Sequence, residues 1–204
     1  MKKTLLLTVI LALFAGLCIM AQKPIERPGK KSERKTMTAP KKSGGRKAAA
    51  AVSQDQPVDL GLPSGLRWSD RNVGAKSASA PGREFCWSDI STESAFARHT
   101  GWDGDWRMPT KSEVLELIRN CTWTKEKKNG RNGYTATGPN GNSIFLPANN
   151  TSWGFVGTYW TSTPDANHLF DDTLAETLYF ASNADPETCT YSRDLKLFVR
   201  PVVR

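Results

Sequence analysis

Histidine, serine and carboxylate side chains around residue 168 are the first place to look for catalysis in this 204-residue chain. His168 is one of only two histidines, and its sequence neighbours Ser162, Asp171 and Asp172 would complete a hydrolytic Ser/His/Asp set. Ser162 does not stand in the Gly-x-Ser-x-Gly pattern of a nucleophile elbow, so polar loop residues are the simpler interpretation. We therefore predict no catalytic residue and no enzyme activity, with a hydrolase assembled from distant segments as the less favoured hypothesis.

Carboxylates give little support for a metal site. The segment 102–106, Trp-Asp-Gly-Asp-Trp, offers two local carboxylates, whereas calcium takes six to eight oxygen ligands. We expect Asp105 to bond the backbone or Arg107 instead. No phosphate-binding glycine loop, dinucleotide fingerprint or H-E-x-x-H pattern is present, so we predict no metal and no cofactor.

Tryptophan is unusually frequent, and all seven Trp residues lie beyond residue 56. Aromatic ring faces stack on the C–H surfaces of sugars, while neighbouring Asn and Asp side chains bind the hydroxyls. Four of the seven alternate within strand-like runs and are expected in the core, namely Trp68, Trp87, Trp123 and Trp160. The predicted ligand-binding residues are Asn149, Asn150 and Trp153 in one polar segment, and His168 and Asp171 in the next.

These candidates fall in segments 148–157 and 164–176, which we predict to be long loops on a rigid sheet, where binding residues tend to lie. Two helices accompany the sheet. Thr110 and Glu113 form a capping-box pattern, and the apolar spacing that follows predicts a helix over 111–120. A second helix is expected over 92–99, with Ser91 as N-cap and Gly101 as its stop.

Short strands separated by Asn-Gly and Gly-Asn turns dominate the rest of the domain. Three of them, over 122–127, 134–137 and 143–146, predict an antiparallel meander. Its turns are expected at residues 129–130, 132–133 and 139–141. Further strands are predicted over 158–162, 177–181 and 196–203. With 16 Gly and 12 Pro, an all-helical bundle is disfavoured.

The formal net charge of +8 belongs almost entirely to the first 56 residues. Lys2 and Lys3 precede an apolar run over 5–20, and Ala21 provides a small-residue cleavage point, which predicts an export signal over 1–21. An uncleaved membrane anchor and lipidation at Cys18 are the alternatives. Residues 57–204 form one domain of nearly neutral charge, so we expect no nucleic-acid partner.

Residues 22–56 are basic and contain almost no large apolar side chains, which predicts a disordered linker. One interpretation is an electrostatic tether to an anionic surface, such as envelope lipid head groups or acidic polysaccharide. The other is a solvated spacer whose lysines keep it soluble. The two interpretations have equal support.

The cysteines allow at most one intrachain disulfide after residues 1–21 are removed. Cys86, Cys121 and Cys189 then remain, an odd number in a compartment where disulfides persist. No pair has the C-x-x-C spacing of a zinc or redox site. One bridge and free buried thiols are equally good interpretations.

Several phrases in a fixed order carry a family resemblance. They are VDLGLPSG (58–65), NVGA (72–75), DWRMPT (105–110), NGY (132–134), GPNGNSIFLP (138–147), YWTST (159–163), LYF (178–180) and VRPV (199–202). Together they resemble the Fibrobacter succinogenes major paralogous domain of exported Bacteroidetes proteins, over nearly all of residues 57–204. The resemblance implies export and an α+β, C-type-lectin-like fold.

The resemblance implies little chemistry. Gly138 stands where calcium-binding C-type lectins carry Glu, so calcium-dependent sugar binding does not follow. The spaced cysteine pair of the distantly related formylglycine-generating enzymes is missing, and so oxidase activity does not follow either. Many relatives carry Cys where this chain has Arg71, so any bridge formed there cannot form here.

Three functional hypotheses result. The first is an exported, non-catalytic module at the cell surface, in the periplasm or secreted, that binds glycan or another cell-envelope component through 148–157 and 164–176. The second is a structural or assembly component of a surface appendage that packs against an envelope protein. The third is the hydrolase with a dispersed site.

Overall fold

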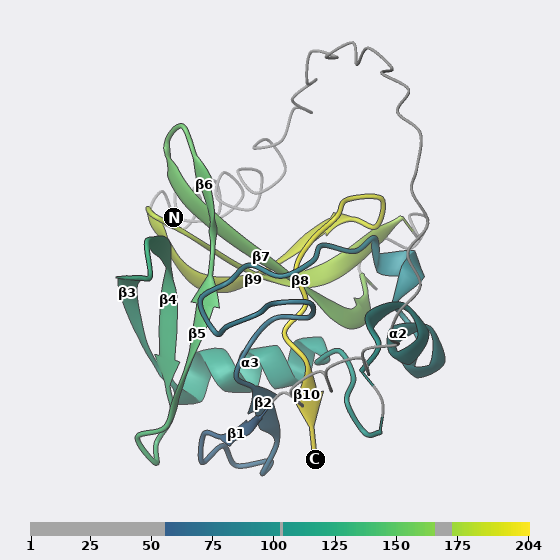
Figure 1. Cartoon of the computed structure of the whole chain (residues 1–204), viewed down its shortest axis with the longest axis horizontal. Helices are drawn as coiled ribbons and strands as arrows, with labels where there is room; N and C mark the ends of the chain where they lie inside the picture. Colours follow the sequence, from purple (N-terminus) through teal and green to yellow (C-terminus); the bar gives the residue numbers. More distant parts are fainter. Residues whose placement is uncertain (1–55, 103, 166–172) are drawn as a thin grey trace, which may run out of the picture. The chain divides into compact units, whose positions relative to one another are not determined.

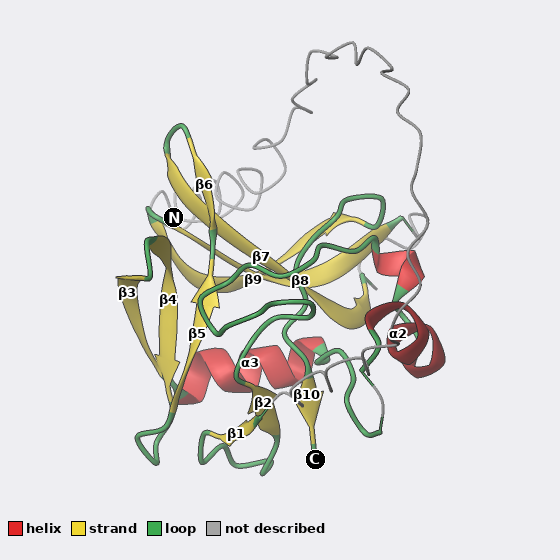
Figure 2. Ribbon diagram, viewed as in Figure 1, coloured by secondary structure: helices red, strands yellow, loops and turns green. Residues whose placement is uncertain are grey.

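Three small antiparallel sheets and two α-helices make up residues 56–102, 104–165 and 173–204, which are the part of the chain that the structure describes (Figure 1; Figure 2). In this computed structural model they belong to one unit, Asp55–Arg204. The predicted α+β class with mostly antiparallel strands is confirmed. The predicted export signal and all of the linker except Gln56 lie outside the described residues. Within those residues, no helix is long and apolar enough to cross a bilayer.

The first sheet joins the two ends of the domain. In Figure 1 the third sheet lies above helix α3, and the second stands at the left-hand end of that helix. The first has the order β1-β2-β10, the second β3-β4-β5 and the third β6-β7-β8-β9. The strand bounds are β1 Pro57–Asp59, β2 Arg67–Ser69, β3 Thr122–Lys128, β4 Arg131–Thr137, β5 Ser143–Pro147, β6 Asn149–Thr151, β7 Gly154–Pro164, β8 Leu174–Ala181, β9 Ala184–Ser192 and β10 Val202–Val203. The helices are α2 Glu93–Thr100 and α3 Lys111–Asn120, with a 3-10 turn, η2, over Trp87–Asp89.

Helix α3 forms where the capping box predicts it. The Thr110 hydroxyl accepts a hydrogen bond from the Glu113 N–H at 3.3 Å, and the Glu113 carboxylate accepts one from the Thr110 N–H at 2.7 Å. The helix buries Val114 and Leu117. Its first residue, Lys111, forms an ion pair at 2.5 Å with Glu176 of β8, which fixes the start of α3 to the third sheet.

Helix α2 begins one residue later than predicted. Its N-cap is Thr92, whose backbone is extended and whose hydroxyl accepts a hydrogen bond from the Ala95 N–H at 3.2 Å. The assignment of Ser91 as the cap was therefore wrong. Gly101 ends the helix in the left-handed region with φ 75°, as predicted.

The predicted meander is confirmed as β3-β4-β5. Asn129 and Gly130 form its first turn with positive φ, as a two-residue hairpin turn requires. The turn predicted at Asn132-Gly133 was wrong, because both residues lie inside β4. A Cβ at Gly133 would stand 2.3 Å from the Leu146 carbonyl oxygen, so this glycine permits close strand approach rather than a turn.

Other strand predictions need correction. Segment 148–157 is mainly the hairpin of β6 and β7, and the end of segment 164–176 belongs to β8. The strand predicted over 196–203 shrinks to β10, preceded by isolated bridges at Leu197 and Phe198. Strand β9 was missed because its residues are mostly polar and include Pro186. It forms through pairing with β8, which no local pattern reveals.

The core is built largely from aromatic and aliphatic side chains of all three sheets and of α3. Trp68 and Trp160 are fully buried, as predicted. Trp87 and Trp123 are only half-buried, so the prediction is too strong for those two. The Tyr134 and Phe180 rings meet edge to face at 5.1 Å and connect the second sheet to the third.

A buried guanidinium connects three distant segments of the domain. Arg200 is only 1% exposed. Its Nε donates to Asn72 Oδ1 at 2.9 Å, and its two terminal nitrogens donate to the carbonyl oxygens of Ser69 at 3.0 Å and Phe145 at 2.6 Å. The C-terminal segment, the segment after β2 and strand β5 are thereby held together.

Asn72 and Tyr159 extend this network toward two further loops. The Asn72 amide donates to the Pro81 carbonyl oxygen at 2.9 Å and to the Tyr159 hydroxyl at 3.3 Å. Tyr159 in turn donates to the Pro147 carbonyl oxygen at 2.5 Å. Burial raises the pKa of Tyr159 to about 12, so its hydroxyl stays protonated and remains a donor at neutral pH.

Segments 59–61 and 138–142 also dock on each other. The side-chain amides of Asn140 and Asn142 both donate to the Asp59 carbonyl oxygen, at 2.9 and 2.7 Å. Gly138 lies so close to Leu60 that a Cβ would stand 1.9 Å from the Leu60 carbonyl oxygen. These glycine and asparagine positions therefore serve packing between segments.

Arg200→Met should destabilise the domain strongly. The substitution leaves three buried acceptors without this donor, and each unsatisfied buried group costs about 1–3 kcal/mol. We expect a loss of at least about 3 kcal/mol in the free energy of unfolding, measured by urea denaturation. The matched control Arg204→Met changes an exposed terminal residue and should stay within about 0.5 kcal/mol of wild type. A loss below about 1 kcal/mol for Arg200→Met would contradict the role assigned to the network.

Glu113→Gln should remove a pH-dependent part of the stability. Burial raises the pKa of Glu113, whereas hydrogen bonds from Arg107 and Thr110 lower it. The hydrogen bonds together have the larger effect, so the folded-state pKa lies below the usual value. The stabilisation is therefore fully present above the unfolded-state pKa of about 4.3 and is lost as pH falls through the folded-state pKa. At pH 7 the variant should lose about 1 kcal/mol, the difference between a charged and a neutral acceptor.

The measurement for Glu113→Gln is urea denaturation at a series of pH values from 7 downward. The gap between wild type and variant should close at acid pH, because both acceptors are then neutral. Glu187→Gln, at an exposed carboxylate on β9, is the control and should show no such closing gap. A gap for Glu113→Gln that stays constant with pH would contradict the assignment.

Candidate functional site

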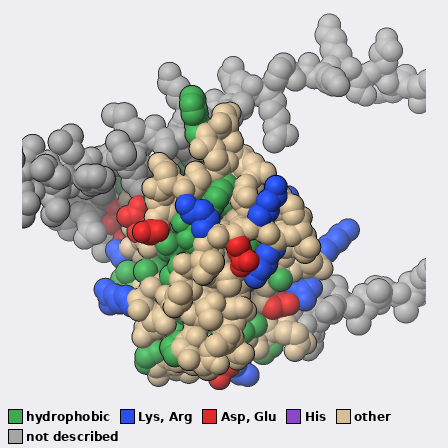
Figure 3. Space-filling view, turned by 90° about the vertical axis from the view of Figure 1, so that its left-hand side faces the viewer, with side chains coloured by type: hydrophobic (Ala, Val, Ile, Leu, Met, Phe, Trp, Pro, Cys, Tyr) green, Lys and Arg blue, Asp and Glu red, His purple; other side chains and the backbone are tan. Residues whose placement is uncertain are grey.

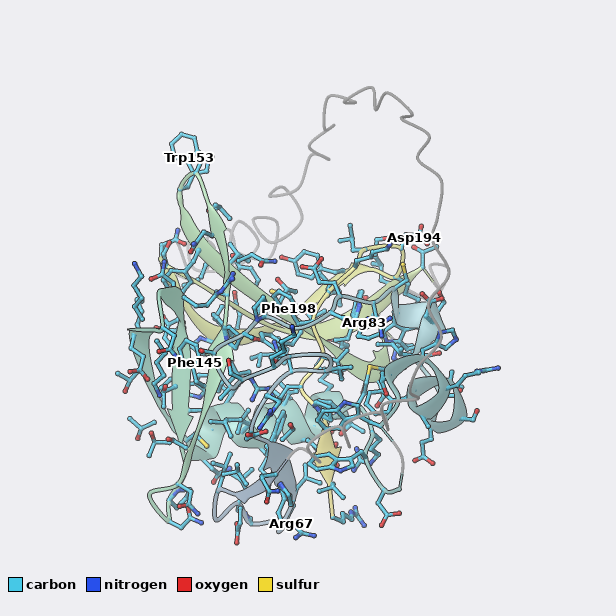
Figure 4. All side chains as sticks on the ribbon, viewed as in Figure 1. Arg67, Arg83, Phe145, Trp153, Asp194 and Phe198 are labelled. Atoms are coloured by element: carbon cyan, nitrogen blue, oxygen red, sulfur yellow. The ribbon has the colours of Figure 1, made fainter. Side chains whose placement is uncertain are left out.

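The β6–β7 hairpin projects from the body of the domain and carries Trp153 at its tip (Figure 1; Figure 4). The Trp153 side chain is 94% exposed, and among the described residues it is the one large hydrophobic side chain that is exposed. The Trp153 backbone N–H donates to the Thr151 hydroxyl at 3.3 Å, which fixes the turn locally. Large apolar side chains are normally buried, so the accessible ring of Trp153 is a candidate contact for a ligand.

The base of the hairpin is held firmly. Phe155, two residues after Trp153, is buried and meets the Tyr134 ring edge to face at 6.2 Å. The Phe155 carbonyl oxygen accepts a hydrogen bond from the Ser182 N–H at 2.9 Å. Gly154 has φ 135°, and a Cβ there would stand 2.1 Å from the Ser182 hydroxyl. The turn between β8 and β9 therefore supports the hairpin just below its tip.

Asn149 and Asn150 lie on opposite faces of the hairpin, because successive strand residues point in opposite directions. The Asn149 amide donates to the Glu84 carboxylate at 3.0 Å. The Asn132 side-chain amide donates to the side-chain oxygen of Asn150, Oδ1, at 3.0 Å. Both asparagines are exposed but already bonded, so they brace the hairpin against its neighbours rather than forming one pocket with Trp153.

The buried network positions both supports of the hairpin. Tyr159 holds Pro147, and the Ala148 N–H donates to the Asn132 carbonyl oxygen at 2.9 Å, so the chain entering β6 is fixed. Asn72 holds Pro81, at the start of the loop that carries Glu84. The direction of the hairpin thus depends on contacts between residues far apart in the sequence.

His168 and Asp171, the remaining predicted ligand-binding residues, lie outside the described residues. The structure therefore brings three of the five predicted residues onto one hairpin, and it presents only Trp153 at the tip. Sequence reasoning treated 148–157 as a loop and missed Thr151 and Gly154, which shape the turn. The available signal was the sequence Ser-Trp-Gly, in which Ser152 and Trp153 form the turn and Gly154 pairs with Thr151.

The surface around the hairpin is mixed in charge. Figure 3 shows basic and acidic side chains interspersed on this side, with hydrophobic groups small and separated and one hydrophobic side chain projecting at the top. Lys125 of β3 donates to the Ser182 carbonyl oxygen at 2.5 Å and lies 5.9 Å from the centre of the Tyr134 ring. Burial and the nearby Asp185 carboxylate raise the pKa of Tyr134. This arrangement suits a neutral polar ligand better than a strongly charged one.

Metal chemistry finds no support in the geometry. Among residues 56–102, 104–165 and 173–204, no group of three or more His, Cys, Asp or Glu side chains could hold a metal ion. Trp102 and Trp106 pack edge to face at 5.0 Å. Arg107 takes Glu113 as its carboxylate partner, with nitrogen-to-oxygen distances of 2.9 and 2.6 Å, rather than the expected Asp105.

Two of the cysteines are free thiols, Cys86 and Cys121, so no bridge joins them. The Cys86 thiol donates to the Asp194 carbonyl oxygen at 3.6 Å. Burial, aided by the Glu116 carboxylate, raises the pKa of Cys121 to about 11, which keeps this thiol protonated and unreactive at neutral pH. Cys121 therefore lacks the character of a nucleophile or a metal ligand.

Comparison with known proteins gave no match to a family model, a curated protein or a solved structure. Function must therefore be argued from the chain's own geometry. The hairpin supplies a rigidly supported, exposed tryptophan with hydroxyl and amide groups nearby, and such an arrangement is suited to binding rather than to bond cleavage.

Proposed function

We propose that the protein is an exported, non-catalytic surface module that binds glycan of the cell envelope through the β6–β7 hairpin. The observation that carries the proposal is the 94% exposed Trp153 at the tip of a hairpin whose base is held on both faces. An indole ring offers a flat apolar face for the C–H surface of a sugar. Thr151 and Ser152 beside it are exposed, so their hydroxyls are available to sugar hydroxyls.

A braced hairpin favours affinity as well as placement. Binding costs free energy for every side chain and loop that must be ordered, and a hairpin that is already ordered avoids much of that cost. Tryptophan itself has only two side-chain torsions, so its contact area comes at low entropy. Both considerations support Trp153 as the main contact and the two asparagines as its supports.

The family assignment also belongs to this proposal. We propose a C-type-lectin-like domain of the Fibrobacter succinogenes major paralogous type, exported by the signal over 1–21. Support comes from where the resembling phrases meet: Asn72 of NVGA bonds Arg200 of VRPV, and Asp59 of VDLGLPSG bonds two asparagines of GPNGNSIFLP. A set of phrases that build one packed framework is what a shared fold requires.

The basic linker over 22–56 is proposed to tether the domain to an anionic surface, either lipid head groups or acidic polysaccharide. Its basic residues contrast with the nearly neutral domain, so attraction to anions and recognition by the hairpin reside in separate parts of the chain. The tether would raise the local concentration of the domain at that surface.

A second candidate function, an assembly component of a surface appendage, is favoured by strand β9. It is the edge of the four-stranded sheet, and its nine residues alternate in exposure over much of their length. An edge strand can pair with a strand of a partner protein. Co-purification of a stoichiometric envelope protein, lost on changing β9 but not Trp153, would favour this function over glycan binding.

Trp153→Ala should weaken glycan binding by at least about tenfold, because the stacking surface is lost. Trp153→Tyr should keep most of the affinity, since an aromatic face remains. The measurement is binding to immobilised envelope polysaccharides and a glycan array, followed by titration of the best ligand. Both variants should keep wild-type stability, because the side chain is exposed. Unchanged binding in Trp153→Ala, or no binding to any polysaccharide, would contradict the proposal.

Deletion of residues 23–47 should remove the salt-sensitive part of surface binding. These residues hold most of the linker's lysines and arginines, and exposed charges are screened at high ionic strength. The measurement is co-sedimentation with anionic vesicles and with acidic polysaccharide over a salt series. Neutral vesicles serve as the control. The tether hypothesis fails if the deletion leaves the salt dependence unchanged on both anionic materials.

A further inference from the structure

A second candidate site lies at a pocket of about 420 Å³ between the start of α2, the segment before α3 and strand β7. Its volume is within the range of about 300–1,000 Å³ that is usual for small-molecule sites. The pocket is separate from the Trp153 hairpin, since α2 and β6 lie on opposite sides of the view in Figure 1.

The apolar part of the pocket wall comes from Ile90, Phe96 and Met108. All three side chains are buried and belong to segments that meet only in the folded domain. They are held in place by the cap of α2 and by the backbone around Pro109, whose carbonyl oxygen accepts the Ser162 N–H at 2.8 Å. These side chains are packed behind the lining, with only 1–2% of their surface exposed.

Hydroxyl groups line the pocket beside this apolar surface. Thr110 uses its oxygen to accept the Glu113 N–H, so its hydroxyl hydrogen can still be donated. Ser162 donates to the Pro109 carbonyl oxygen at 3.4 Å and keeps its oxygen as an acceptor. Ser91 and Thr92 add two further hydroxyls from the start of α2. The pocket lining thus offers both a hydroxyl donor and a hydroxyl acceptor.

The charges of the pocket disfavour an anionic ligand. Arg107 lines it, but this guanidinium bonds both carboxylate oxygens of Glu113 and the Met108 carbonyl oxygen. The hydrogen bond to Glu113 raises the pKa of Arg107 against the opposing effect of burial, and Glu113 and Glu93 add favourable charge interactions. The Glu93 carboxylate also lines the pocket and is exposed. Two carboxylates against one guanidinium disfavour an anion, and the hydroxyl-bearing lining suits a ligand that itself carries hydroxyl groups.

We propose that this pocket binds one neutral sugar residue. The exposed Glu93 carboxylate would accept hydrogen bonds from neighbouring hydroxyls of the sugar. Thr110 and Ser162 would bond the hydroxyls on the opposite edge. The site is independent of the role assigned to Trp153, so it stands or falls separately from the proposed function.

The test is a titration of the ¹⁵N-labelled full chain with methyl glycosides of neutral hexoses, followed by amide NMR. We expect saturable shifts at amides of segments 90–96 and 107–110. Inorganic phosphate and glucosamine form separate arms for an anion and a cationic amine. Saturable shifts of these amides with phosphate alone, or with glucosamine alone, would overturn the proposal in favour of the other ligand class.

Two variants address the pocket itself. Ser91→Phe should fill the pocket, and Glu93→Gln should remove its strongest acceptor. Each variant should lower the affinity for the sugar by at least about tenfold. The matched controls are Ser88→Phe and Asp89→Asn, nearby exposed positions that do not line the pocket. No shift with any neutral hexose, or sugar affinity unchanged in both pocket variants, would overturn the proposal.

Discussion

The buried guanidinium of Arg200 is the interaction on which the rest of the domain depends. Removing a charge from water is costly unless every donor is satisfied, and Arg200 is 1% exposed. It donates to the Asn72 side chain and to two main-chain carbonyl oxygens, those of Ser69 and Phe145. A charge with acceptors fixed on three segments permits only one arrangement of those segments. The network therefore specifies the fold as well as contributing to its stability.

The same network determines where the exposed tryptophan stands. Asn72 donates a hydrogen bond to Pro81, which lies in the same loop as Glu84. Glu84 in turn accepts a hydrogen bond from one face of the β6–β7 hairpin. The Tyr159 hydroxyl donates a hydrogen bond to Pro147, two residues before the start of β6. The tip itself makes almost no contact with the domain, so its position is set from below. An exposed aromatic ring can act as a binding group only if its support is stiff, and here the stiffness originates in the core.

Local patterns predicted the elements that depend on local interactions. The capping box of Thr110 and Glu113 and the Asn129-Gly130 turn involve residues a few positions apart, and both formed as expected. Strand β9 could not be predicted, because its polar residues become a strand only when β8 lies beside them. The Asn72–Arg200 bond joins residues 128 positions apart, and nothing at either position alone signals it. Trp153 was identified as a candidate from its polar neighbours, but the opposite directions of Asn149 and Asn150 required knowledge of the hairpin.

The hairpin and the pocket differ in how they depend on this framework. The pocket walls come from the starts of α2 and α3, each stabilised by its own cap, and from a β7 segment next to Pro109. The hairpin takes both of its supports from loops that the Arg200 network holds. Loosening that network would disorder the hairpin before the locally capped helices, because regions of a domain open with different free energies. The proposed hairpin site and the proposed pocket site therefore depend on the Arg200 network to different degrees.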